Sequence, residues 1–289
     1  MSSAPASHPT PTPSSSISPS PSRADPGRAA ELAENLAEIR GRIDSCLQST
    51  RKGVDNSSKP VLVAVSKYKP ASDVLACYEH GQRDFGENYV QELVEKAKEL
   101  PQDIRWHFIG TFQTNKSKLL ASIPNLYAFQ TLSSIKAADA LNKALPPERE
   151  RVPLNVLLQV NTSGEDVKSG LPPLTSIEST NENEEASILA LAIHVLENCP
   201  RLHLQGLMTI GSLSESLSSD DENRDFNTLV QTRDRLVELL RKRRKWSEGR
   251  RLLLSMGMSS DFEAAIKAGS DIVRVGTGIF GQRHLKGEK

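Results

Sequence analysis

Val273-Arg-Val-Gly-Thr-Gly-Ile-Phe-Gly281, near the C-terminus, reads as a short apolar strand that runs directly into a glycine-rich loop. A second stretch, Leu254-Ser-Met-Gly-Met-Ser-Ser-Asp261, has the same order of apolar run, glycine and hydroxyl side chains. In a (β/α)8 barrel, the loops after strands seven and eight commonly hold a phosphate at the face where the strands end. The two stretches therefore predict the last two strands of such a barrel, each followed by a phosphate-binding loop.

A lysine ends the first apolar run of the chain, Pro60-Val-Leu-Val-Ala-Val-Ser-Lys67. A side chain at the C-terminal end of a barrel strand points into the site at that face. In a dry pocket the ammonium form of lysine is disfavoured, and the free amine can condense with an aldehyde to give a Schiff base. A lysine beside a phosphate-binding loop suggests pyridoxal phosphate (PLP) as the ligand.

The region between these stretches alternates strand-like and helix-like patterns, which is typical of a parallel barrel. One amphipathic helix, expected over residues 28–47, precedes the first strand, because apolar residues recur there at spacings of three and four. The expected strands cover residues 61–66, 84–86, 105–109, 125–129, 154–160, 202–207, 252–254 and 272–275. The expected helices between them cover residues 74–80, 89–100, 115–122, 135–145, 187–198, 223–242 and 262–268.

Composition limits the class of protein. The 289 residues carry 36 Lys and Arg against 36 Asp and Glu, a balance that argues against wholesale nucleic-acid or membrane binding. No apolar run is long enough to span a membrane. The three cysteines, Cys46, Cys77 and Cys199, are widely spaced and form no CxxC pair, so we expect reduced thiols in a cytoplasmic protein without a metal site.

We divide the chain into a disordered Ser/Pro-rich tail at 1–27 and one barrel domain at 28–289. The tail lacks the apolar core of a signal peptide, and a mitochondrial presequence is the weaker alternative to a cytoplasmic location. Polar stretches at 172–185 and 212–223 are expected to be surface insertions. The basic run at 241–245 is expected to be a solvated helix end, with nuclear import or nucleic-acid binding as the alternative.

Assembled in order, these segments resemble the pyridoxal phosphate homeostasis protein family, whose barrel is similar to the N-terminal domain of alanine racemase. The matching segments include Val63-Ala-Val-Ser-Lys67, Phe85-Gly-Glu-Asn-Tyr-Val-Gln-Glu92, Trp106-His-Phe-Ile-Gly110, Gly206-Leu-Met-Thr-Ile210 and the two glycine-rich stretches. The resemblance implies an α/β fold, a single (β/α)8 barrel of PLP fold type III with an extra N-terminal helix. It also implies that Lys67 forms the Schiff base and that Arg274 faces the pyridine nitrogen.

The resemblance implies a set of cofactor-binding residues and no catalytic ones. Its phosphate-binding residues are Gly257, Ser259, Ser260, Gly276 and Thr277. The same hydroxyls and amides would also serve an ordinary helix cap, so the two interpretations compete for one geometry. Asn88, His107 and Met208 are candidates for lining the cofactor, although a histidine on a barrel strand is as often a core residue with satisfied hydrogen bonds.

Three functions remain open at this point. The first, implied by the resemblance, is a binding protein without catalysis that holds PLP on Lys67, takes part in vitamin B6 and amino-acid homeostasis, and exchanges PLP with apo-enzymes or salvage enzymes. The second is an amino-acid racemase of weak activity, which needs a second acid–base group opposite the lysine. The third is a phosphosugar enzyme with Lys67 as an aldolase lysine. Because we expect no second domain before Lys289, we favour the first and a monomer.

Overall fold

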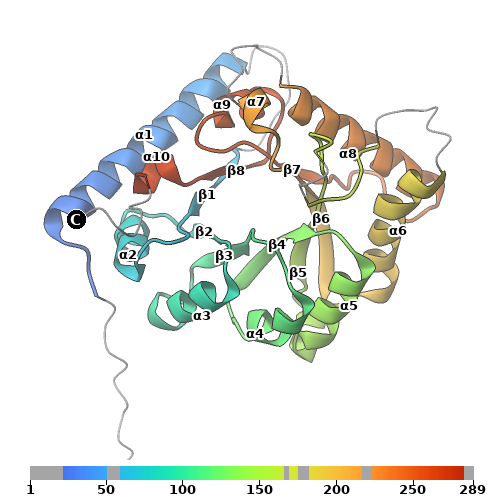
Figure 1. Cartoon of the computed structure of the whole chain (residues 1–289), viewed down its shortest axis with the longest axis horizontal. Coiled ribbons are helices and arrows are strands. Elements are labelled where there is room, and N and C mark those ends of the chain that lie inside the picture. The colour runs from blue at the N-terminus through green and yellow to red at the C-terminus, as the bar shows by residue number, and fades with distance from the viewer. Residues whose placement is uncertain (1–21, 51–58, 166–168, 175–181, 217–222, 283–289) are drawn as a thin grey trace, which may run out of the picture.

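The computed structural model describes residues 22–50, 59–165, 169–174, 182–216 and 223–282. Eight parallel strands close into a barrel in the order β1 to β8, with β1 paired to β8, and helices surround it (Figure 1). The strands are β1 Val61–Val65, β2 Asp84–Glu87, β3 Arg105–Phe108, β4 Leu126–Leu132, β5 Leu154–Gln159, β6 Leu202–Met208, β7 Leu253–Ser255 and β8 Ile272–Val275. The fold confirms the expected (β/α)8 barrel with an extra helix at its N-terminal end.

One helix precedes β1, and the other helices follow the strands in turn. They are α1 Pro26–Thr50, α2 Ala71–Glu79, α3 Val90–Glu99, α4 Ser117–Ala121, α5 Ile135–Ala144, α6 Glu182–Asn198, α7 Leu213–Ser216, α8 Arg224–Lys242, α9 Phe262–Lys267 and α10 Thr277–Phe280, with 3-10 turns η1 Thr114–Lys116 and η2 Pro147–Glu150. Because helices cover the sheet from outside and side chains fill the barrel inside, strands such as β5 are buried along almost their whole length. Among the described residues, we find no helix long and apolar enough to cross a membrane.

The N-terminal helix α1 packs across the last helices of the chain, α9 and α10, and across α2 (Figure 1). Its apolar face is buried at Leu32, Leu36, Ile39 and Ile43. Polar side chains of α1 also reach the end of α10: Arg28 Nη2 donates to Phe280 O at 2.8 Å, and Asn35 Nδ2 donates to Ile279 O at 3.0 Å. These bonds satisfy carbonyls that the end of a short helix leaves without partners. The first helix therefore holds the last one in place.

Several boundaries differ from the expected ones. Strand β4 continues to Leu132, three residues beyond the expected end, and brings Gln130 and Thr131 into the barrel wall. Helix α6 begins at Glu182, inside the first polar stretch, and α7 lies inside the second. The basic run at 241–245 is exposed at the end of α8. Residues 1–21 and parts of both polar stretches lie outside the described residues, so the division into tail, barrel and insertions stays a prediction.

Candidate functional site

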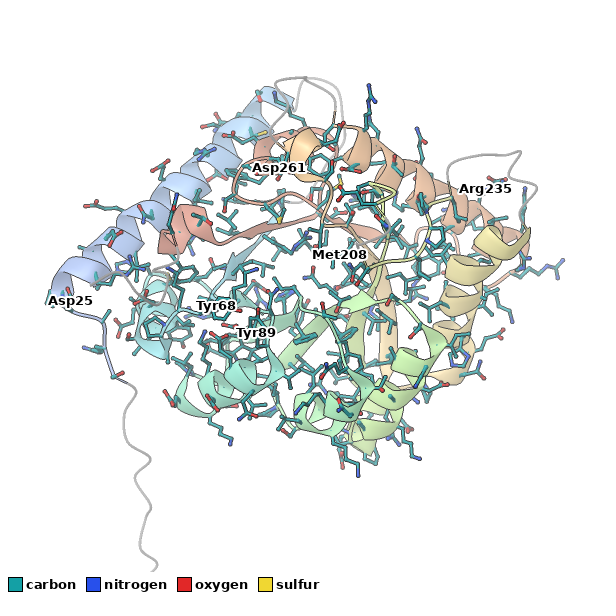
Figure 2. The ribbon with its side chains drawn as sticks, in the orientation of Figure 1. Asp25, Tyr68, Tyr89, Met208, Arg235 and Asp261 are labelled. Carbon is teal, nitrogen blue, oxygen red and sulfur yellow. The ribbon has the colours of Figure 1, made fainter. Side chains whose placement is uncertain are left out.

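A cavity of about 780 Å³ opens at the face of the barrel where the strands end. Its walls come from the ends of β1, β6 and β8, from the residues that follow β2 and β3, and from the loops after β7 and β8. Most of the residues expected at the site line it: Lys67, Asn88, Met208, Ser259, Ser260, Arg274, Gly276 and Thr277. Figure 2 shows Met208 near the middle of the barrel and the neighbouring Tyr68 and Tyr89 at one side of it. The barrel thus brings together residues from both ends of the sequence.

Ser66, the residue before Lys67, is held by hydrogen bonds at its N–H, its hydroxyl and its carbonyl. Ser66 is buried; its N–H donates to Gly86 O at 3.0 Å and its hydroxyl donates to Glu87 Oε1 at 2.7 Å. The Lys96 ammonium, which is also buried, donates to Ser66 O at 2.7 Å. Directly after Lys67, Tyr68 has a φ of 63°, a left-handed conformation that is unfavourable for a side chain of its size. The chain therefore turns sharply at the lysine, within a frame that sets its direction.

A buried ion pair forms the centre of that frame. Lys96 Nζ lies 2.6 Å from Glu87 Oε1 and 2.7 Å from Glu92 Oε1, and Glu92 Oε1 also accepts from the N–H of Tyr68 at 2.7 Å. Burial raises the pKa of the Glu87 carboxyl, although the ammonium of Lys96 opposes that shift. The second oxygen of Glu87 is buried and accepts no hydrogen bond from any of the described residues. The pair is therefore costly to bury, and its geometry holds β1, β2 and α3 together behind Lys67.

The hydroxyl of one serine connects the two glycine-rich loops through hydrogen bonds. Ser259 Oγ, from the loop after β7, accepts from the N–H groups of Gly276 and Gly278 at 3.2 and 3.3 Å. These amides begin the turn into α10, so their N–H groups point at a place where an anion would also be bound. A Cβ on Gly276 would lie 3.3 Å from Val65 O, which shows how closely this loop approaches β1. The observed bonds are those of a cap, formed by the amides that a phosphate would use.

Gly257 shapes the loop and does not line the cavity. Its φ is 91°, and a Cβ there would lie 2.5 Å from the Cβ of Ala265, so the loop requires glycine. Asp261 holds the other side of the loop: its Oδ1 accepts from Met258 N at 2.6 Å, and its Oδ2 accepts from the Ser216 hydroxyl at 2.5 Å. The sequence places Asp261 directly before a helix, but not the contact with Ser216, which comes from a distant segment.

Arg274 presents a cation to the cavity from inside the barrel. The residue is 4% exposed; its Nη1 donates to Ser255 Oγ and its Nη2 to Thr209 O, each at 2.7 Å. Burial lowers the pKa of its guanidinium to about 10, with the charge of Asp261 acting in the opposite direction. At neutral pH the side chain is still a cation, and its position is fixed by bonds to β7 and to the residue that follows β6.

His107 is not brought to the cavity, which differs from one of the two placements that the sequence allows. The side chain is 1% exposed in the barrel interior. Its Nε2 lies 3.0 Å from Asp84 Oδ1 and its Nδ1 lies 2.9 Å from Gln130 Nε2. Both ring nitrogens are thus occupied by protein groups. Asn88, in contrast, lines the cavity, and within the described part of the chain its buried Oδ1 accepts no hydrogen bond.

Several residues that organise the site carry little signal in the sequence. Glu92 and Lys96 stand four residues apart, a spacing that predicts a helical ion pair, but not one that reaches Glu87 and Ser66. Ser255 and Gln130 interrupt apolar runs, which is the one visible sign of their inward bonds.

The cysteines are buried, and the pKa of the Cys199 thiol is raised to about 11 by burial. In the described part of the chain, potential metal ligands gather at Asp139, His194 and Cys199, whose ligand atoms lie within 4.8 Å of one another. His194 Nε2 lies 2.6 Å from Asp139 Oδ1, an ordinary pair between the outer helices α5 and α6. The group does not contribute to the cavity at the strand ends.

The buried ion pair behind Lys67 leads to a stability prediction. Lys96→Met leaves the Glu87 carboxylate buried without its cation, so we expect a loss of about 3 kcal/mol in the free energy of unfolding. Lys96→Met with Glu87→Gln removes both charges and should recover a large part of that loss. Urea unfolding of the wild type, both single variants and the double variant checks this. A double variant less stable than Lys96→Met alone would contradict the assignment.

Comparison with known proteins gives the family. The alanine racemase N-terminal domain model matches residues 35–284. A curated relative from Schizosaccharomyces pombe, named pyridoxal phosphate homeostasis protein, is 43% identical over 244 residues, which cover 83% of this chain and 93% of the relative. The human protein of the same name is 44% identical over 230 residues, which cover 78% of this chain and 77% of the relative.

Solved structures agree with these matches. PipY of Synechococcus elongatus, solved with PLP bound, superposes with a TM-score of 0.63 at 28% identity and covers 86% of this chain and 100% of its own. Alanine racemase of Corynebacterium glutamicum superposes with a TM-score of 0.58 at 16% identity, covering 90% of this chain and 64% of the racemase, which shows a shared fold. With its closed barrel, its loop chemistry and its relatives, the chain belongs to the pyridoxal phosphate homeostasis protein family.

Proposed function

We propose that this chain binds PLP in the cavity at the strand ends and holds it through Lys67. The observation that carries the proposal is the meeting of three chemically matched groups on one cavity: an amine at Lys67, hydroxyls and amides at the glycine-rich loops, and a cation at Arg274. PLP has an aldehyde, a phosphate and a ring nitrogen at separate corners. When bound, the cofactor supplies an aldehyde that forms a Schiff base with the lysine. The names of the relatives and the PLP-bound PipY structure support the same ligand.

Different residues of the cavity contact different parts of this ligand. The phosphate is bound by the amides of Gly276 and Gly278 and by the hydroxyls of Ser259, Ser260 and Thr277. In the structure the Ser259 hydroxyl accepts hydrogen bonds from these two amides. When the phosphate binds, the amides donate to the phosphate instead, and the Ser259 hydroxyl donates to a phosphate oxygen. A separate pair, Asn88 and Met208, flanks the ring from the walls of the cavity.

Arg274 faces the ring nitrogen in this proposal. A permanent cation beside that nitrogen disfavours its protonation. An unprotonated pyridine ring withdraws fewer electrons and is a poorer sink for a carbanion. The geometry therefore suits holding the cofactor more than using it.

The biological role that follows is retention and release of PLP, a part in vitamin B6 and amino-acid homeostasis without catalysis. A free aldehyde modifies other amines, which gives a physical reason to keep it bound. We propose that the chain acts as a cytoplasmic monomer and exchanges PLP with apo-enzymes or with vitamin B6 salvage enzymes.

The shared fold makes racemisation the second candidate. Racemisation needs proton exchange on both faces of the substrate carbon, and so a second acid–base group opposite the lysine. Among the described residues that line the cavity, Lys67 and Arg274 carry the ionisable side chains, and an arginine holds its proton too tightly for this work. The lining favours binding over racemisation.

Lys67 is tested against a matched lysine two residues away. We expect the purified wild type with PLP to show a visible absorption band, and borohydride reduction to leave a pyridoxyl group on Lys67 in peptide mass mapping. Lys67→Ala should lose both. Lys69→Ala should keep both, because the Lys69 ammonium is occupied with Phe280 O and Gln282 O at 2.9 and 3.0 Å. An adduct on Lys69, or none on either, would sink the proposal.

The phosphate loops are tested with two ligands. Ser259→Ala removes one hydrogen bond to a doubly charged group, so we expect the dissociation constant for PLP to rise about 10-fold, which corresponds to ~1.4 kcal/mol. Pyridoxal, which lacks the phosphate, should bind the variant and the wild type equally. Fluorescence titration with both ligands provides the measurement. An equal loss for both ligands would place Ser259 away from the phosphate.

The racemase candidate is tested directly. We expect PLP-loaded protein to racemise L-alanine and L-serine no faster than free PLP does, since the described residues that line the cavity include no acid–base group opposite Lys67. Chiral chromatography after long incubation, with Lys67→Ala as the control, measures this. Exchange that depends on Lys67 would establish the second candidate.

A further inference from the structure

A continuous chain of hydrogen-bonded side chains crosses the barrel interior beneath the cavity. It runs from Arg274 on β8 to Ser255 on β7 (2.7 Å), then to Gln130 on β4 (2.6 Å), His107 on β3 (2.9 Å) and Asp84 on β2 (3.0 Å). We call these five residues the polar chain. Each of them is at most 6% exposed. The polar chain thus connects the wall of the cavity with the opposite end of the barrel.

Such a chain is expensive in a place where barrels normally pack bulky branched side chains. A buried polar group without a partner costs several kcal/mol, and a chain is tolerated only if every member is satisfied. Every link here is within hydrogen-bonding distance. Of the five members, only Arg274 lines the cavity. Contact with a ligand therefore does not explain why the other four polar side chains are buried there.

The two ends of the polar chain determine the direction of every bond. Arg274 can only donate, so the Ser255 oxygen accepts and the Ser255 hydrogen is free to reach Gln130 Oε1. Gln130 then turns its amide nitrogen to His107 Nδ1, which must accept. The proton of His107 lies on Nε2 and is donated to Asp84. In this arrangement His107 is neutral, as the Nε2–H tautomer.

Asp84 is the anionic end. Burial opposes ionisation of its carboxyl, but hydrogen bonds from His107 and Arg105 outweigh that effect and lower its pKa. The Arg105 side chain, about half exposed, donates from Nε to Asp84 Oδ1 at 2.8 Å. A carboxylate thus stands at one end of the polar chain and a guanidinium at the other, and each bond between them polarises the next in the same direction.

We propose that the polar chain positions Arg274 against the cofactor, with Ser255, Gln130 and His107 as positioning residues that set the protonation of the cofactor's ring nitrogen. The inference rests on the proposed function. In the described part of the structure no carboxylate forms a salt bridge with Arg274, so the bonds to Ser255 and Thr209 O hold its plane. The polar chain extends the first of these bonds to a fixed anion. A change at Gln130 therefore reaches the ring nitrogen through Arg274, without contact with the cofactor.

The test uses PLP labelled with 15N at the ring nitrogen, bound to full-length protein. We expect the wild type to show the resonance of an unprotonated pyridine nitrogen. Gln130→Met breaks the polar chain in its middle, and Ser255→Ala removes the partner of Arg274 with a smaller change of volume. Both should move the resonance toward the protonated position and raise the dissociation constant for PLP about 10-fold, or ~1.4 kcal/mol.

The matched control is Phe129→Leu, the residue beside Gln130 on β4, which is fully buried and outside the polar chain. It should lower thermal stability while the 15N resonance and the PLP affinity stay at their wild-type values. A resonance that moves equally in Phe129→Leu would show a general loss of core packing. An unchanged resonance in folded Gln130→Met and Ser255→Ala would overturn the positioning role.

A second readout needs no cofactor. The imidazole 15N shifts of His107 in PLP-free protein should be those of a neutral Nε2–H ring, with assignment by His107→Gln. A ring protonated at Nδ1 would overturn the direction of the polar chain. If the wild type fails to bind PLP, the proposed function fails and the role toward the ring nitrogen falls with it. Normal binding with an unmoved resonance in the two variants removes the further inference alone.

Discussion

The pairing of the first strand with the last is the constraint on which the site depends. Val63 pairs with Arg274 and Ala64 with Val275, and this register sets the end of β1 beside the loop after β8. Lys67 and Gly276 then share one cavity although almost the whole barrel lies between them in sequence. The approach is close enough that a side chain at Gly276 would press on Val65 O. Helix α1 adds to the closure, because Arg28 and Asn35 bond to the carbonyls that end α10.

Two buried polar systems stand behind the cavity, one for each end of the proposed ligand. Glu87 and Lys96 fix Ser66 and thereby the direction of Lys67, whereas the polar chain fixes Arg274. Both place charge in the interior, where apolar residues of similar size would often be more stable. These buried charges lower the stability of the fold, but they hold the side chains at the strand ends in fixed positions, as is common where a scaffold holds a binding site.

Local patterns account for what could be predicted and for what could not. The apolar runs of β5 and β8 are buried along almost their whole length, and β1 is buried at Val63 and Ala64, so these runs stand out in the sequence and their order predicts a parallel barrel. In β4 the polar pair Gln130 and Thr131 interrupts the run, and the expected strand stops at Phe129. The interruption arises because Gln130 bonds across the barrel to Ser255 and to His107 on the neighbouring strand β3. No window of residues adjacent in sequence contains these partners.

The order of strands and helices, the two glycine-rich loops and the lysine that ends β1 could all be derived from the chain itself, because each depends on contacts or backbone conformations within a few residues. Only the tertiary structure showed that Arg274 reaches the cavity. It also showed that His107 lies beneath the cavity, with both ring nitrogens in hydrogen bonds. It also showed that Gly257 shapes its loop by its backbone and that Asp261 is held by Ser216. The depth of a side chain inside a barrel depends on the partners that the other strands supply, and closure of the barrel brings those partners together.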